Sequence, residues 1–329
     1  KMNQVNLKNF GRGLFNEDFK IDEIKGDASN RRYYRLSSNK KSFILMDSSR
    51  ENRNFTNFLK FSSIFEKHKI NIPKILKRNM KENLLIVEDF GDNLIYKKCN
   101  PKNFNQIYEK SVQNICDIQK IAERNIYLYK KEKYLSESSL FLEWVLIRFL
   151  DIKIPSKDKN RIMKEINTVV DNIDHKNYKL VHRDYHSKNI FYKNGKIVVI
   201  DYQDAVLGSP LYDLVSLLND CYRDINYKQK NRLKNLFLEK FNSQSKKKLS
   251  SDELLHNFDI LSIQRHMKAS GIFCRLSKKN SRHGYLKYLK RTFDYIINAS
   301  SNYTNLKTIN FYAKEAKNQF NESNNFSSR

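Results

Sequence analysis

The sequence predicts an α+β protein in which a small β-rich N-lobe precedes a larger helical C-lobe. Apolar and polar residues alternate, as they do in strands, through much of residues 19–47. From Pro101 onward, apolar residues recur at the three- and four-residue steps typical of helices. No internal repeat and no Pro-, Gly- or Ser-rich linker divides the 329 residues. We therefore expect an N-lobe over 1–92 and a C-lobe over 93–315 that share a cleft, followed by a frayed tail over 316–329.

The expected N-lobe contains strands at 19–25, 32–37 and 42–46, a helix at 51–68, and a second strand pair at 74–79 and 84–90. The turn between the first two strands reads Gly-Asp-Ala-Ser-Asn-Arg over residues 26–31. A loop of such small residues can direct its backbone N–H groups toward phosphates, although many hairpin turns share this composition. Gly26, Ser29 and Asn30 are therefore candidate nucleotide-binding residues.

The expected C-lobe is helical apart from one hairpin. A helix begins near Pro101, and further helices are expected at 134–150, 158–173, 211–222, 228–241, 251–267, 269–278 and 283–299. Asp213 lies in the first turn of the 211–222 helix. We expect its carboxylate to cap the preceding polar loop, although an acidic residue at a helix start is common.

Composition limits the classes of function. Lys and Arg total 62 against 36 Asp and Glu, a formal net charge of +26. The basic residues are mostly Lys, spread along an Asn- and Ile-rich chain, so we expect no nucleic-acid partner. The strongest apolar run, 140–150, is short and contains Glu143 and Arg148, so we expect no membrane span. Four dispersed cysteines and the lack of a signal-peptide pattern favour the cytoplasm.

The most informative stretch runs from Leu180 to Asp204. Two short apolar runs, Ile-Phe-Tyr and Ile-Val-Val-Ile, flank the turn signal Asn194-Gly195 and predict a β-hairpin. Asn189 then begins one strand and Asp201 ends the other, with the polar loop of Asp184 just upstream. Their oxygen-bearing side chains are expected to converge at one end of the hairpin.

This arrangement suits phosphoryl transfer from ATP. Mg²⁺ takes oxygen ligands, usually one or two from the protein, and Asn189 and Asp201 can provide them. Asp184 can accept the proton of the attacking hydroxyl, whereas His182 is expected to support the loop through hydrogen bonds. Isolated Asp and Asn residues often only form turns. The full pattern, His-x-Asp-x-x-x-x-Asn followed by a strand and Asp, favours the catalytic interpretation.

The segments VHRDYHSKNIFY and VVIDYQDAVLGSPLYDLVSLLND resemble those of protein-kinase-like small-molecule kinases, specifically the aminoglycoside phosphotransferase family. Within it, they are most similar to the bacterial N-acetylmuramate/N-acetylglucosamine anomeric kinases. The resemblance covers about residues 24–297 and implies a two-lobed protein-kinase-like fold, ATP and Mg²⁺ as cofactors, and a small-molecule sugar substrate. It also implies a catalytic-loop role for His186, where protein kinases carry Lys.

For the nucleotide, the resemblance implies a hinge over Glu88-Asp89-Phe90-Gly91, with Glu88 and Phe90 beside the adenine. It also matches GDASNRRYYR to the nucleotide-covering loop of the anomeric kinases. In the wider kinase group, a Lys on the third strand binds the phosphates, but Met46 stands at about that position here. Arg32 and Arg35 are our candidate replacements, because guanidinium binds phosphate well, although solvent-facing arginines on a strand are an equal alternative.

For the acceptor, three stretches resemble the amino-sugar kinases: DYQDA at 201–205, LSIQRH with GIF at 261–273, and FLEW at 141–144. The resemblance implies sugar contacts from Gln203 and Asp204, and it places the helix that carries Glu143 in the substrate region. Trp144 can stack on a sugar or fill a helix core. Arg265 can bind the lactyl carboxylate of N-acetylmuramate or lie on a helix surface.

The implied reaction is phosphorylation of the anomeric hydroxyl of N-acetylmuramate, N-acetylglucosamine or both, as in cell-wall sugar recycling. Two alternatives stay open. The chain can phosphorylate another small hydroxyl compound, although a cationic aminoglycoside requires an acidic cleft, which the strongly basic chain disfavours. It can also be a catalytically silent kinase-fold interaction protein, against which the presence of Asp184, Asn189 and Asp201 argues. The sequence does not determine the oligomeric state.

Overall fold

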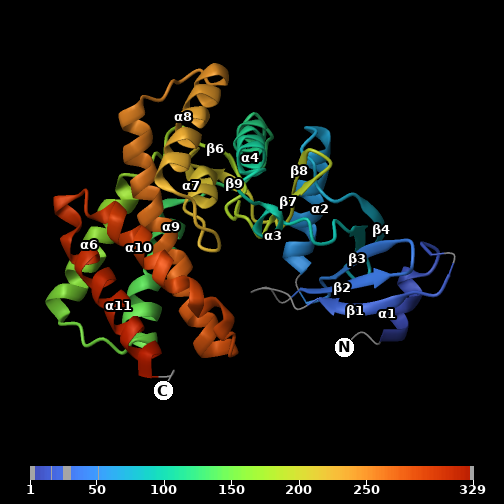
Figure 1. Cartoon of the computed structure of the whole chain (residues 1–329), viewed down its shortest axis with the longest axis horizontal. Helices are drawn as coiled ribbons and strands as arrows, with labels where there is room; N and C mark the ends of the chain where they lie inside the picture. Colours follow the sequence, from blue (N-terminus) through green and yellow to red (C-terminus); the bar gives the residue numbers. More distant parts are fainter. Residues whose placement is uncertain (1–3, 16, 25–30, 51, 327–329) are drawn as a thin grey trace. The chain divides into compact units, whose positions relative to one another are not determined.

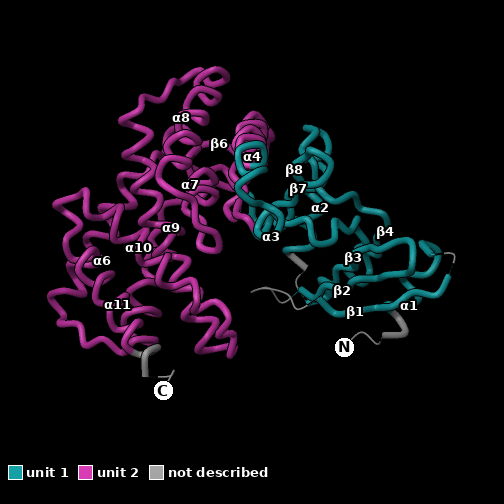
Figure 2. The backbone as a smooth tube through the Cα atoms, viewed as in Figure 1, with its two compact units in different colours: residues 1–107, 188–205 teal, residues 108–187, 206–329 magenta. Residues whose placement is uncertain are grey.

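The computed structural model describes residues 4–15, 17–24, 31–50 and 52–326. The chain forms two compact units (Figure 2). Unit 1 comprises residues 1–107 and 188–205, and unit 2 comprises residues 108–187 and 206–329. Unit 1 thus extends beyond residue 92 and includes the hairpin that follows the polar loop. The boundary after Ser187 separates Asp184 from Asn189 within one short sequence motif.

Unit 1 is built on a five-stranded antiparallel sheet in the order β1-β2-β3-β5-β4 (Figure 1). The strands are β1 (Lys20–Ile24), β2 (Arg32–Ser37), β3 (Ser42–Asp47), β4 (Ile75–Asn79) and β5 (Leu84–Glu88). All five were predicted, β1, β2 and β3 from the alternating pattern of residues 19–47 and β4 and β5 as a further strand pair. Leu36, Leu45 and Ile86 are fully buried, and Leu7 of helix α1 (Gln4–Gly11) joins their core.

Helix α2 (Asn52–Lys67) matches the predicted helix and buries Phe55, Phe61 and Phe65. Strands β7 (Ile190–Lys193) and β8 (Lys196–Val199) form the predicted hairpin. The hairpin is attached to the rest of unit 1 by backbone hydrogen bonds, because Val199 N–H donates to the Asn71 carbonyl at 3.1 Å and Tyr192 N–H to Asn93 at 2.9 Å. The short helix α3 (Ile95–Lys98) precedes the first turn of α4 (Phe104–Gln119).

Unit 2 is mainly helical. Its elements are the rest of α4, then α5 (Lys131–Ser138), the π-helical segment η1 (Phe141–Phe149), α6 (Ser156–Asp171), α7 (Tyr212–Leu218), α8 (Tyr227–Gln244), α9 (Ser251–Asn280), the 3₁₀ segments η2 (His283–Tyr288) and η3 (Thr304–Leu306), α10 (Leu289–Ser300) and α11 (Lys307–Phe326). Strands β6 (Lys179–Val181) and β9 (Val206–Gly208) pair antiparallel beside them.

Helix α9 is the centre of unit 2. It contacts α5, α6, α7, α8, α10, η1 and η2, which explains why its buried residues are distributed around the helix. At Gly271 a β-carbon would lie 2.4 Å from the Leu140 Cβ, so only glycine permits this approach. The prediction of separate helices at 251–267 and 269–278 is wrong, because Lys268 between them does not interrupt a helix and is itself buried.

Other predicted boundaries also differ. The helix expected at 134–150 is divided into α5 and η1. At the junction between α5 and η1, the Ser138 and Ser139 hydroxyls donate to the carbonyls four residues earlier. The helix expected at 211–222 ends at Leu218, and Asp220 beyond it accepts hydrogen bonds from the Ser187 and Tyr222 backbones.

The C-terminal part contains two further corrections. The helix expected at 283–299 begins as the 3₁₀ segment η2 and becomes α-helical only at Leu289. The tail from residue 316, expected to fray, is helical as far as Phe326. Ala316 and Phe320 are buried, and they continue the apolar stripe of Ile309 and Tyr312 along α11.

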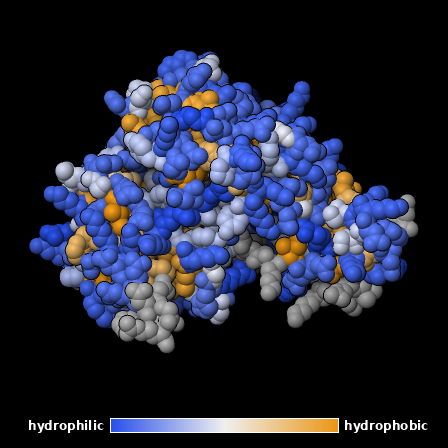
Figure 3. Space-filling view, viewed as in Figure 1, coloured by the Kyte–Doolittle hydropathy of each residue, from blue (hydrophilic) through white to orange (hydrophobic). Residues whose placement is uncertain are grey.

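Polar and charged residues cover most of the face seen in Figure 3, with apolar residues in scattered small patches. Across the described part of the chain, every helix is too short or too polar to cross a membrane.

Candidate active site

The hairpin of unit 1 brings Asn189 and Asp201 to the same end. Asn194 and Gly195 form its turn with φ of 52° and 74°, the left-handed conformation that an Asn-Gly turn supplies. At the opposite end, the Ile200 N–H donates to the Asn189 carbonyl at 3.0 Å. Asn189 therefore directly precedes β7, while Asp201 lies just beyond β8, as the sequence predicted.

Asp201 is held by Arg31, a residue that the sequence did not single out. The Arg31 Nη2 donates to the Asp201 Oδ1 at 2.8 Å, and its Nη1 donates to the Gln203 Oε1 at 3.0 Å. The Gln203 amide returns a hydrogen bond to Asp201 Oδ1 at 3.0 Å. The Arg31 side chain is 4% exposed and that of Asp201 39%. Asp201 has a φ of 65°, a conformation that Asp tolerates better than most residues.

The two candidate phosphate-binding arginines occupy different surroundings. Arg35 forms a bidentate pair with the buried Asp89, with Nε to Oδ2 at 2.7 Å and Nη2 to Oδ1 at 3.2 Å. Asp89 also accepts the Gly91 N–H at 2.7 Å, so Arg35 fixes the segment that follows β5. Arg32 is partly exposed on β2 and interacts with Tyr34. Met46 is buried in β3, where the wider kinase group carries Lys.

The predicted hinge segment is tied to its neighbours in unit 1. The Glu88 backbone donates to the Lys74 carbonyl, and the Glu88 carboxylate accepts the Lys74 N–H at 3.0 Å. The Phe90 ring packs against Phe191 of the hairpin, with ring centroids 5.6 Å apart. Gly26, Ser29 and Asn30, the candidate nucleotide-covering residues, lie outside the described residues.

In unit 2, the loop after β6 is held by hydrogen bonds to the Asp213 carboxylate of α7. This carboxylate accepts the His182 N–H at 2.7 Å and the Arg183 N–H at 3.0 Å, which confirms the predicted capping. Arg183 has a φ of 76°, an unusual conformation that these bonds support. Burial raises the pKa of Asp213 above its ordinary value, although His182 and both hydrogen bonds act in the opposite direction. His182 is also buried, and its Nδ1 accepts the Asp184 N–H at 3.3 Å, as a loop-supporting residue would.

Asp184 points its carboxylate toward cations. The Arg265 Nη1 lies 3.5 Å from the Asp184 Oδ1, and the Asp184 side chain is 35% exposed. Burial alone would raise the pKa of Asp184, but the charges of Lys268, Arg265 and His186 together hold it well below the ordinary value of 3.8. Asp184 is therefore an ionised acceptor at neutral pH. His186 is partly buried, with its ring edge-on to Tyr222 at 4.8 Å.

The predicted acceptor-binding residues separate into two groups. Asp204 is exposed in unit 1 and accepts a hydrogen bond from the buried Gln203 at 3.3 Å. Glu143 is exposed in unit 2 and pairs with Arg148 at 3.0 Å. Trp144 is 6% exposed, with the Arg148 guanidinium 4.7 Å from its ring centroid. Of the two roles left open for Trp144, these surroundings support the filling of a helix core.

Arg265 is not a surface residue. Its side chain is 6% exposed, and it donates to the Arg183 carbonyl at 3.3 Å beside Asp184. These contacts support a role in holding the loop after β6. The expected role of Arg265 in binding a lactyl carboxylate stays a prediction.

Two other charged residues of this region were missed from the sequence. Glu137 of α5 accepts a hydrogen bond from Arg183 at 2.8 Å, and Lys268 of α9 lies 3.8 Å from Glu137. Lys268 follows Arg265 by three residues, so the two share a helix face, and this spacing was the available signal. Nothing in the local sequence distinguishes Glu137 from an exposed helical Glu.

The profile of the phosphotransferase enzyme family (APH) matches residues 20–234. Among curated proteins, the chain is 25% identical to the N-acetylmuramate/N-acetylglucosamine kinase of Neisseria meningitidis serogroup B, over 93% of each chain. It is also 25% identical to the kinase of the same name from Pseudomonas aeruginosa, over 82% of this chain and 80% of the relative.

Solved structures share the fold at lower identity. A choline kinase from Streptococcus pneumoniae superposes with a TM-score of 0.61 and 12% identity, covering 93% of this chain and 98% of that one. An amicoumacin kinase in complex with AMP-PNP and Ca²⁺ superposes with a TM-score of 0.61 and 15% identity, covering 90% of this chain and 93% of that one. An ADP-bound aminoglycoside phosphotransferase superposes with a TM-score of 0.58 and 13% identity, covering 90% of this chain and 97% of that one.

Proposed function

The chain belongs to the phosphotransferase enzyme family, and on that premise we propose that it transfers the γ-phosphoryl group of ATP to the anomeric hydroxyl of N-acetylmuramate, N-acetylglucosamine or both. The observation that carries this choice of acceptor is the match with a curated kinase of these two sugars over 93% of both chains. The choline and amicoumacin kinases share the fold at 15% identity or less, and they supply no argument about the acceptor.

Asp184 is the proposed acceptor for the proton of the sugar hydroxyl. An anomeric hydroxyl is more acidic than an ordinary alcohol, so a weakly basic carboxylate is adequate. Phosphoryl transfer also depends chiefly on positioning and electrostatic stabilisation. A carboxylate kept ionised by Arg265 and Lys268, on a loop that Asp213 fixes, meets both needs.

Asn189 and Asp201 are the proposed ligands of Mg²⁺. Within the described ranges, no group of three or more His, Cys, Asp or Glu side chains could hold a metal by itself. This agrees with Mg²⁺, which uses one or two protein oxygens and completes its shell with phosphates and water. When bound, the ion would neutralise phosphate charge. An amide and a carboxylate at one end of a rigid hairpin fit that ion.

Arg31 is the proposed replacement for the third-strand Lys. It directly follows the expected nucleotide-covering loop, and its buried guanidinium already binds a carboxylate in unit 1. Guanidinium binds phosphate through the same paired donors. Arg35 is a weaker candidate, because Asp89 occupies two of its donors.

A panel of acceptors tests the proposed function. The purified chain is incubated with Mg-ATP and, separately, N-acetylmuramate, N-acetylglucosamine, their unacetylated counterparts, choline and an aminoglycoside, with ADP release measured. We expect turnover with one or both N-acetylated sugars and only background rates with choline and the aminoglycoside. Turnover with choline or the aminoglycoside alone would overturn the assignment of an amino sugar as the acceptor. No turnover with any compound of the panel would overturn the assignment of the chain as a kinase of these acceptors.

A further inference from the structure

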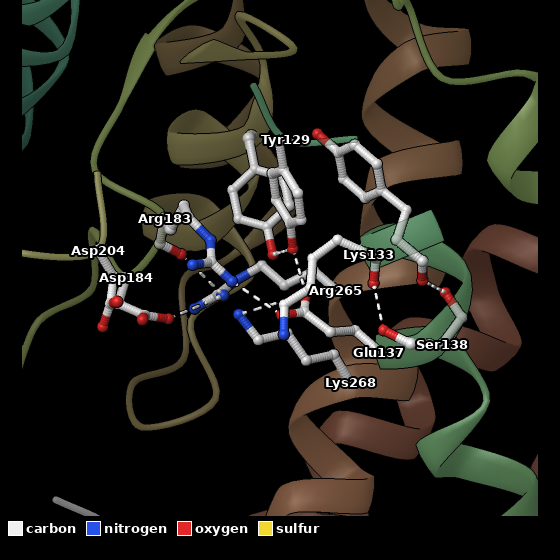
Figure 4. Close-up of polar contacts among 12 residues, drawn as sticks. Tyr129, Lys133, Glu137, Ser138, Arg183, Asp184, Asp204, Arg265 and Lys268 are labelled. Carbon is white, nitrogen blue, oxygen red and sulfur yellow. Dashed lines mark hydrogen bonds and ion pairs between the residues drawn. The ribbon is translucent and has the colours of Figure 1, made fainter. Parts of the chain in front are cut away.

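Five charged side chains lie together at the loop after β6 in unit 2, and we call them the charge cluster: Glu137, Arg183, Asp184, Arg265 and Lys268 (Figure 4). They come from α5, the loop after β6, and α9. Apart from Asp184, every side chain in the charge cluster is between 6% and 13% exposed. Burying charges is costly unless they are paired, so this arrangement requires a reason.

Glu137 binds two of the three cations. Its Oε1 accepts a hydrogen bond from the Arg183 Nη2 at 2.8 Å, and its Oε2 lies 3.8 Å from the Lys268 Nζ. The Tyr129 hydroxyl donates to the same Oε2, and the Arg183 guanidinium stacks over the Tyr129 ring. The Nζ of the exposed Lys133 lies 3.4 Å from the Glu137 Oε1, and solvent weakens this ion pair by screening the Lys133 charge. Although burial would raise the pKa of Glu137, Lys268 and Arg183 hold it below its ordinary value.

The charge cluster contains three cations and two carboxylates. Glu137 forms ion pairs with Arg183 and Lys268, and the Arg265 Nη1 lies 3.5 Å from the Asp184 Oδ1. Lys268 and Arg183 also act on Asp184 through their charges. If Glu137 lost its charge, Asp184 would be the only carboxylate of the charge cluster left for all three cations. Closer ion pairs would then turn the Asp184 carboxylate away from an acceptor hydroxyl and make it a weaker base.

We propose that Glu137 and Lys268 are positioning residues for phosphoryl transfer: Glu137 keeps Arg183 and Lys268 from pairing with Asp184, and Lys268 balances the charge of Glu137. This inference rests on the proposed catalytic role of Asp184. It predicts that the charge balance matters more than either residue alone. Neutralising Glu137 raises the net charge of the charge cluster from +1 to +2, and removing Lys268 as well restores +1.

A charge-compensation experiment tests this directly. Glu137→Gln should lower kcat about tenfold or more, equivalent to about 1.4 kcal/mol, with the KM for Mg-ATP unchanged. The double variant Glu137→Gln/Lys268→Met should recover most of the lost kcat. Glu132→Gln, an exposed residue on the same helix, is the matched control and should match the unmodified chain. An additive loss in the double variant, or a rise in KM with unchanged kcat, would overturn the proposal.

A second measurement separates the proposal from the choice of substrate. Titration of ¹³C-labelled aspartate carboxyls, with Asp184 assigned through Asp184→Asn, measures the same coupling without any acceptor. The groups that bear on Asp184 are Arg183 and His186 on its own loop and Arg265 and Lys268 on α9. The Asp184 midpoint should rise in Lys268→Met and return toward that of the unmodified chain in the double variant. If it does so in a chain that phosphorylates neither sugar, only the proposed substrate fails. An Asp184 midpoint that is unchanged in Lys268→Met and in the double variant would overturn the inference.

Discussion

Asp201 in unit 1 and Asp184 in unit 2 are similarly exposed, at 39% and 35% of their side chains, yet their neighbours differ. Asp201 lies beside one arginine and one neutral amide, Arg31 and Gln203. Asp184 lies within a set of three buried cations that a second carboxylate balances. The comparison teaches that exposure does not distinguish the proposed metal ligand from the proposed proton acceptor, whereas the surrounding charges do. A carboxylate held by one arginine can exchange that arginine for a metal ion, and the arginine can then bind a phosphate. Three fixed cations instead keep a carboxylate ionised.

The largest effect is expected at Asp201. Asp201→Ala should reduce turnover to background, because the proposed metal site loses its only charged ligand, while helix content by circular dichroism stays unchanged. Asp92→Ala, which removes an exposed carboxylate of the same unit, is the matched control. A rate equal to that of the unmodified chain would end the metal-ligand assignment.

Asp184→Asn should be the next most damaging change. We expect kcat to fall by roughly 10²–10⁴, the usual contribution of a positioned acid–base group. The KM for ATP should stay nearly constant, because Asp184 belongs to the proposed acceptor side. Weaker ATP binding with an unchanged kcat would mean that Asp184 acts on the nucleotide instead.

Arg31 of unit 1, which binds Asp201, is tested as the residue that contacts the phosphates of ATP. A charge-assisted contact contributes about 1.5–3 kcal/mol, so Arg31→Met should raise the KM for ATP by roughly ten- to a hundredfold. Arg32→Met, the partly exposed neighbour, should change it little. If the two variants exchange these effects, the phosphate contact belongs to Arg32.

Arg265 tests how Asp184 is held. Because Arg265 contacts the catalytic loop, Arg265→Ala should lower kcat about equally for N-acetylmuramate and N-acetylglucosamine. Michaelis–Menten kinetics with both sugars give the comparison. A loss confined to N-acetylmuramate would instead assign Arg265 to its lactyl carboxylate.

The smallest effect is expected in the pH dependence. The folded-state pKa of Asp184 is depressed below 3.8, so its ion pairs contribute stability that is present above that value and lost as pH falls through the folded pKa. Between pH 7 and about 5, therefore, Asp184 should add no acid limb to kcat/KM. Lys268→Met removes a charge that lowers the pKa of Asp184, so the acid limb that Asp184 produces at low pH should move to higher pH. An acid limb near neutral pH that disappears in Asp184→Asn would contradict the depressed pKa.

The sequence predicted best what depends on neighbouring residues. The hairpin follows from Asn194-Gly195 and two apolar runs, and the first three strands of the sheet follow from the alternation within residues 19–47. Capping by Asp213 was also predicted, from its place at the start of a helix.

What the sequence did not reveal depends on long-range contacts. Arg31 meets Asp201 across 170 positions, and Glu137 meets Arg183 across 46. No local periodicity encodes such pairs, so an arginine on a strand and a glutamate on a helix look ordinary in the sequence. The burial of Trp144 and Arg265 was likewise decided by helix packing around α9.

The most direct test of the contrast between the two carboxylates is calorimetric titration of ATP into Asp184→Asn and Asp201→Asn, with and without Mg²⁺. We predict that Asp184→Asn binds ATP as the unmodified chain does and keeps the full gain in affinity from Mg²⁺, whereas Asp201→Asn loses that gain. Loss of the Mg²⁺ gain in Asp184→Asn, or its retention in Asp201→Asn, would contradict the assignment of these two carboxylates.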